Sequence, residues 1–63
     1  MQTYYKTITK VYDNGKSIIS STPISVKAVS KPADVCDEGE SCDTYTDFFD
    51  TYTEASQFIK ENR

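Results

Sequence analysis

The sequence contains no histidine and no tryptophan, and it has only two glycines, two prolines and two cysteines among 63 residues. Without histidine, the chain has no imidazole general acid or base, no Ser-His or Cys-His nucleophile pair, and none of the commonest transition-metal ligand. Gly15 and Gly39 are too far apart to form a glycine-rich phosphate-binding loop. We therefore expect a protein that is not an enzyme, with no cofactor and no dedicated metal site.

Long apolar runs are also missing. No segment approaches the roughly 18 apolar residues of a membrane span, and the N-terminal MQTYYKTITK lacks the apolar centre of a secretory signal. The expectation is one small cytoplasmic domain over residues 1–63 that makes no contact with a membrane. A domain of this size is marginally stable unless a disulfide, a metal or self-association supplements its core.

Acidic residues are scarce in the N-terminal half of the chain, and basic residues are scarce in the C-terminal half. Residues 1–31 carry five lysines and one acid, whereas residues 32–63 carry nine acids and two basic residues, for a net charge of −3. The segment 34–50, DVCDEGESCDTYTDFFD, contains seven acids and no basic residue. Such asymmetry bears on partners and solubility rather than on fold. It disfavours a simple nucleic-acid-binding domain, which would be basic overall.

The N-terminal half is predicted to form a β-hairpin. Residues 3–12 and 16–29 are rich in Thr, Tyr, Ile and Val, which favour strands, and Asn14-Gly15 between them favours a two-residue type I′ turn. This turn pairs Val11 with Ile18, and strand alternation then gives the expected core face. Its members are Tyr5, Val11, Ile18, Ile24 and Val26, while Tyr4, Lys6, Ile8, Lys10, Tyr12 and Ile19 take the other face.

The C-terminal half predicts a loop, a strand and a helix. Residues 30–43 show no periodicity and are expected to form an acidic loop, and residues 44–50 resume strand character. Thr51 and Glu54 fit a capping box, followed by an apolar face of Ala55, Phe58 and Ile59. The predicted fold is α+β: a three-stranded, mostly antiparallel sheet, in the order strand, strand, loop, strand, with one C-terminal helix packed on it.

The junction FDTYTEASQFI, over roughly residues 48–60, resembles the strand-to-helix corner of the three-stranded, AP2-like DNA-binding domains of some integrases. Those domains are basic and read DNA with the sheet, whereas the third strand here carries Asp43, Asp47 and Asp50. The resemblance therefore implies a similar fold and not the same function.

Cys36 and Cys42 admit three interpretations. A structural zinc site usually needs four nitrogen or sulfur ligands, which two cysteines without histidine could supply only across a dimer or together with carboxylates. In a reducing compartment the two cysteines are free thiols, but the five residues between them could also turn back and allow a disulfide that closes the acidic loop.

The acidic segment has two interpretations, a solvated loop that maintains solubility or a surface that binds a basic partner. Alternate residues of a strand share a face about 6.8 Å apart, close to two ~3.4 Å steps of one DNA strand. Carboxylates on a strand could therefore replace phosphates in a basic groove. The candidate partner-binding residues are Asp37, Glu38, Glu40, Asp43, Tyr45, Asp47 and Asp50.

The leading hypothesis is a small acidic inhibitor or nucleic-acid mimic that docks on a basic, nucleic-acid-handling protein such as a nuclease. By size and charge alone, it is similar to the anti-defence proteins of phages and mobile elements, including anti-CRISPR proteins. One alternative is a sheet-based nucleic-acid binder that uses Lys6, Lys10 and Lys27 beside Tyr4 and Tyr12, although direct nucleic-acid binding is not expected. Another is a self-associating module, such as a homodimer, with complementary charged halves.

Overall fold

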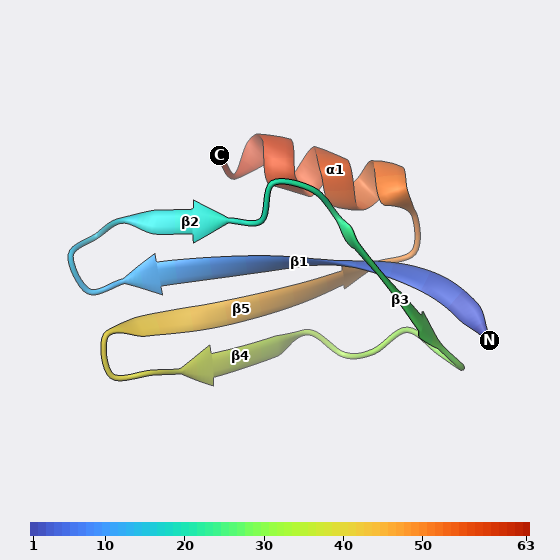
Figure 1. The fold of residues 1–63 in the computed structure, drawn as a ribbon, viewed down its shortest axis with the longest axis horizontal. Coiled ribbons are helices and arrows are strands. Elements are labelled where there is room, and N and C mark those ends of the chain that lie inside the picture. Colours follow the sequence, from blue (N-terminus) through green and yellow to red (C-terminus); the bar gives the residue numbers. More distant parts are fainter.

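The computed structural model describes all 63 residues as five strands and one helix (Figure 1). The elements are β1 (Gln2–Tyr12), β2 (Ser17–Ile19), β3 (Ile24–Ala28), β4 (Val35–Glu38), β5 (Cys42–Phe49) and α1 (Tyr52–Glu61). The expected α+β class with a C-terminal helix is confirmed. The expected number of three strands is wrong, because the second predicted strand is broken into β2 and β3 and the predicted acidic loop contains β4.

β1 is the central strand of an antiparallel sheet. The strand order is β2-β1-β5-β4, and β3 pairs with the N-terminal part of β1. In Figure 1, β3 crosses β1 near its N-terminal end, while the β1–β2 and β4–β5 turns lie together at the opposite end. A hydrogen bond of 3.1 Å from the Asp13 amide to the Ser41 carbonyl joins these two turns.

The first turn is one residue longer than predicted. The amide of Gly15 donates to the carbonyl of Tyr12 (3.0 Å), and the amide of Tyr12 donates to the carbonyl of Lys16 (2.8 Å). Gly15 has a φ of 86°, and no residue other than glycine has a positive φ. Asn14 therefore cannot occupy a type I′ position, and residues 13–15 form a three-residue loop with a glycine bulge instead.

This extra loop residue shifts the pairing of the hairpin. Val11 lies opposite Ser17, and Ile18 lies opposite Lys10. A shift of one residue moves a strand's side chains to the other face of the sheet. The predicted core face is therefore wrong: Tyr5 and Val11 share one face, whereas Ile18, Ile24 and Val26 lie on the other. Ile18 is 61% exposed as a result.

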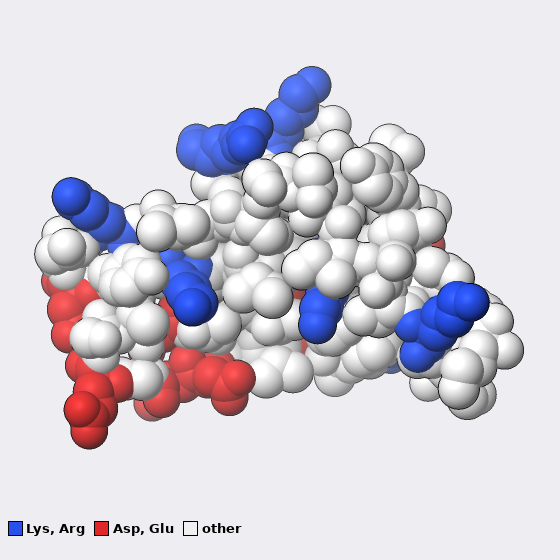
Figure 2. Space-filling view, viewed as in Figure 1, with Lys and Arg blue, Asp and Glu red and all other residues white.

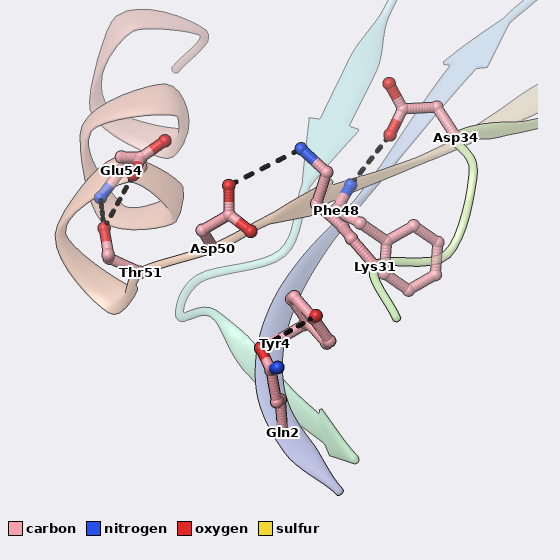
Figure 3. A network of polar contacts seen from close by, with 8 residues as sticks. All are labelled: Gln2, Tyr4, Lys31, Asp34, Phe48, Asp50, Thr51 and Glu54. Carbon is pink, nitrogen blue, oxygen red and sulfur yellow. Dashed lines mark hydrogen bonds and ion pairs between the residues drawn. The ribbon is translucent and has the colours of Figure 1, made fainter. Parts of the chain in front are cut away.

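Helix α1 begins where the capping pattern predicts. Thr51 Oγ1 accepts a hydrogen bond from the Glu54 amide (3.2 Å) and donates one to Glu54 Oε1 (3.1 Å), so the carboxylate binds the hydroxyl rather than a backbone amide (Figure 3). The Thr51 cap satisfies a backbone N–H that would otherwise be free at the helix start. α1 is ten residues long, and the chain contains no helix with the length and apolar character needed to cross a bilayer.

The core lies between α1 and the β1–β5 pair. Ala55 and Ile59 are buried, and two aromatic contacts flank them. The Tyr52 ring meets Tyr5 edge-on, with centroids 5.6 Å apart, and Phe58 meets Phe49 with centroids 5.2 Å apart. Thr7 is fully buried on this side, and Tyr4 is buried on the other side, where it lies opposite Val26 of β3. Only these four residues, Tyr4, Thr7, Ala55 and Ile59, are buried.

The segment expected as a loop continues the sheet. β4 pairs with β5 from Val35–Thr46 to Glu38–Asp43. Before β4 begins, Asp34 Oδ1 accepts a hydrogen bond from the Phe48 amide at 2.9 Å (Figure 3). The side chain of Asp34 thus takes the place of one backbone partner beside β5 and fixes the start of β4.

Replacing Gly15 with alanine should reduce the free energy of unfolding by about 1–2 kcal/mol, because alanine is strained at positive φ. Urea denaturation at a fixed protein concentration measures this loss. Gly15→Asn is the matched control and should lose less, since asparagine tolerates the left-handed region. An alanine variant as stable as the wild type would contradict the three-residue loop.

Candidate functional site

Three side chains of β5 follow one another on the side of the sheet that carries the helix. Asp43, Tyr45 and Asp47 lie opposite Val11, Thr9 and Thr7 of β1, respectively, and so share a face with the residues beneath α1. β4 adds Glu38, opposite Asp43. We call Glu38, Asp43, Tyr45 and Asp47 the acidic face.

The other three candidate residues lie elsewhere. Asp37 is opposite Thr44 and therefore points to the face without the helix. Glu40 is in the β4–β5 turn. Asp50 follows β5 and forms the only ion pair of the chain, with its Oδ2 3.7 Å from Lys31 Nζ (Figure 3). The structure thus gathers four of the seven predicted residues on one surface, and no lysine or arginine neutralises them.

Two neighbours of the acidic face were not predicted from the sequence. Cys36 lies opposite Tyr45, and Asp34 lies close enough to Asp47 for its charge to act on that carboxylate. The signal in the sequence is the alternation of Asp34, Cys36 and Glu38, which places all three on one side once the segment is extended.

The accumulation of negative charge affects two groups. The neighbouring Cys36 side chain, with smaller contributions from Asp43, partial burial and Glu38, raises the pKa of the Tyr45 hydroxyl. Burial, followed by the charge of Asp34, raises the pKa of the Asp47 carboxyl. In both cases the change opposes the addition of another negative charge to a surface without a balancing cation.

The cysteines are not bridged. Both are free thiols. Cys36 shares a side with Tyr45, whereas Cys42 lies opposite Tyr12 on the face without the helix. The two side chains point away from opposite faces of the sheet, so the disulfide alternative does not apply to this structure.

The lysine and tyrosine stripe is broken. Lys6, Lys10 and Tyr12 lie on the face without the helix, but Tyr4 is only 7% exposed and cannot offer its ring to a base. Lys27 lies opposite Thr3 and points to the other side.

The surface of the protein has no pocket, and no three Cys, Asp or Glu side chains converge as metal ligands would. Figure 2, drawn from one side, shows acidic atoms gathered at one end of the molecule, beside the β4–β5 turn, with basic atoms both next to them and across the rest of that side. The candidate site is therefore an open charged surface.

Comparison with known proteins found no family model that matches this chain, no similar curated protein and no similar solved structure. The function is therefore inferred from the chemistry of this surface alone.

Replacing Asp47 with asparagine should stabilise the protein at neutral pH. A raised pKa means that the folded state binds the proton more tightly than the unfolded state, so ionised Asp47 opposes folding, and this effect disappears as the pH falls below the ordinary value of 3.8. Urea denaturation at neutral pH and below pH 3.8 should show a gain only at the higher pH. Asp13→Asn, in the exposed β1–β2 turn, controls for the general loss of one charge. A gain that is equal at both pH values would contradict this account.

Proposed function

We propose that this chain is a non-enzymatic binding protein whose acidic face docks in a basic groove of a nucleic-acid-handling protein, and that it inhibits this partner by replacing nucleic acid. The observation that carries the proposal is that Asp43 and Asp47 share one face of β5, four residues apart with Tyr45 between them, with Glu38 beside Asp43 and no basic residue paired with them. Small anti-defence proteins of phages, including anti-CRISPR proteins, offer an analogy by size and charge.

The spacing of these carboxylates suits a groove that binds phosphates. Side chains two residues apart on a strand are separated by about 6.8 Å, and neighbouring strands by about 4.8 Å. Successive phosphates of one DNA strand advance by about 3.4 Å along the helix axis. Asp43 and Asp47 are four residues apart, so their side chains are separated by about 13.6 Å, roughly four such steps. They can therefore occupy positions that an Arg and Lys groove offers to non-adjacent phosphates, and Glu38 adds a charge from the neighbouring strand.

The acidic face is fixed in position by the sheet. β5 is an interior strand, paired with β1 over eight residues and with β4 over four. Carboxylates on such a strand lose little backbone freedom when a partner binds, which lowers the entropic cost of association. A flexible acidic loop would have to be ordered first.

Tyr45 supplies the apolar contact at the centre of this surface. Its side chain is 38% exposed and lies between Asp43 and Asp47 on the same face. Tyrosine is enriched among the residues that dominate binding energy at protein interfaces. The combination of a central aromatic ring and surrounding carboxylates suits contact with a basic protein better than screening by mobile counterions alone.

The experiment is capture of partners from a lysate of the native host on the immobilised protein. The proposal expects a basic protein that is retained at low salt, released at high salt and displaced by a short DNA duplex, because screening weakens an interaction between charged surfaces. The triple variant Glu38→Gln, Asp43→Asn and Asp47→Asn should weaken binding at least about tenfold, as expected when several charged contacts are lost together.

The matched control is a second triple variant that loses the same charge outside the acidic face, Asp13→Asn, Glu40→Gln and Glu61→Gln. It should retain binding. Equal binding by the two variants, or a partner that DNA does not displace, would contradict the nucleic-acid-mimic proposal and leave the acids with a role in solubility.

A further inference from the structure

The single chain has a small core for a folded protein. Four of its 63 residues are buried, and no disulfide reinforces them. Its accessible surface is 4547 Å², whereas a compact monomer of 7.1 kDa exposes about 4,100 Å². The excess reflects a flat molecule, with backbone extents of 39 × 22 × 12 Å.

One broad surface of this flat molecule has no helix over it. The helix packs on β1 and β5 from the side of Tyr5 and Phe49, and Figure 2 shows one side of the molecule as mainly uncharged atoms with separate basic groups and an acidic cluster at one end. We call this side the helix-free face. Its exposed and half-exposed residues are Ile18 in β2, Lys6, Ile8, Lys10 and Tyr12 in β1, Cys42, Thr44, Thr46 and Phe48 in β5, and Val35 and Asp37 in β4, with Ile24 and Val26 of β3 on the same side.

We propose that two copies of this chain pack their helix-free faces together, related by a two-fold axis that runs parallel to β5. Face-to-face packing with the strands nearly aligned is a common arrangement for two sheets, which then lie about 10 Å apart. Rotation about an axis over β5 places β1 of each copy against β4 of the other, because β1 and β4 flank β5 on its two sides.

The charges on the helix-free face complement one another under this rotation. Lys10 and Asp37 both lie opposite Thr44, one on each side of it, so the three residues form a row across the sheet. Within one copy, Lys10 and Asp37 are two strands apart, about 10 Å, and they form no ion pair. In the dimer, Lys10 of each copy faces Asp37 of the other, and the two Thr44 residues meet at the axis.

The next row is apolar and equally self-complementary. Ile8 and Val35 flank Thr46 in the same way. The rotation places Ile8 of each copy against Val35 of the other, which covers a valine that is 45% exposed in the single chain. Burying apolar surface contributes about 25 cal/mol per Å², so this contact supplements the small core.

A second copy fits this face better than a different protein does. The rows Lys10–Thr44–Asp37 and Ile8–Thr46–Val35 complement themselves under the rotation, and a second copy is present wherever the chain is made. A standard interface buries about 800 Å² of each partner, a fraction of the 4547 Å² that this flat chain exposes. The acidic face lies on the opposite side of the sheet, so the dimer leaves it open, and this inference is independent of the proposed function.

Sedimentation velocity over a concentration series tests the dimer. At roughly 100 µM the wild type should be mainly dimeric, because interfaces of standard size bind at least at micromolar affinity. Lys10→Glu and Asp37→Lys each place like charges face to face, and each should raise the dissociation constant at least about tenfold. The double variant should recover the dimer. Lys60→Glu, on the helix, changes the net charge as Lys10→Glu does and should leave association intact.

Cross-linking tests which face is buried. Cys42 lies on the helix-free face of β5, close to the proposed axis, whereas Cys36 lies on the other face. A short bis-maleimide should therefore join two copies of Cys36→Ser and should not join two copies of Cys42→Ser. A wild type that is monomeric throughout, a dimer indifferent to both charge reversals, or linkage through Cys36 would each overturn the proposal.

Discussion

The antiparallel pairing of β1 with β5 is the interaction on which the rest of the structure depends. It runs from Tyr5–Phe49 to Tyr12–Cys42 and joins the first twelve residues to the last third of the chain. At one end it places Tyr5 and Phe49 beneath the aromatic residues of α1, and toward the other end it presents the acidic face. One strand pair thus supplies both the core and the candidate binding surface. Thr7 is buried in the core, and Asp47, directly opposite it in the strand pair, belongs to the acidic face.

Local signals were sufficient for the features that depend on neighbouring residues. Thr51 and Glu54 identified the helix start, Ala55 and Ile59 its buried face, and strand alternation placed Asp43, Tyr45 and Asp47 on one side of β5. β4 could not be predicted in the same way. Asp and Glu disfavour strands, and all four residues of β4 are exposed. β4 is a strand because its backbone pairs with β5, and the residues of the segment itself give no sign of this pairing.

The hairpin register shows a different limit. The pair Asn14-Gly15 suits a two-residue turn, yet Gly15 alone takes a positive φ and the loop gains one residue. The extra loop residue shifts the register of β2 and places Ile18 on the side without the helix. β3 pairs with β1 only after the break at residues 20–23, and its register places Ile24 and Val26 on that same side. A turn and a strand break thus moved three expected core residues to the helix-free face.

The most direct measurement is the register of β1 against β5, read from through-space proton contacts between backbone groups in the nuclear magnetic resonance spectrum. The account predicts that Thr9 lies across from Tyr45 and Thr7 across from Asp47. Contacts of Thr9 with Thr44 or Thr46 instead would reverse the faces of β5. The carboxylates would then point away from the helix, and neither surface described above would exist.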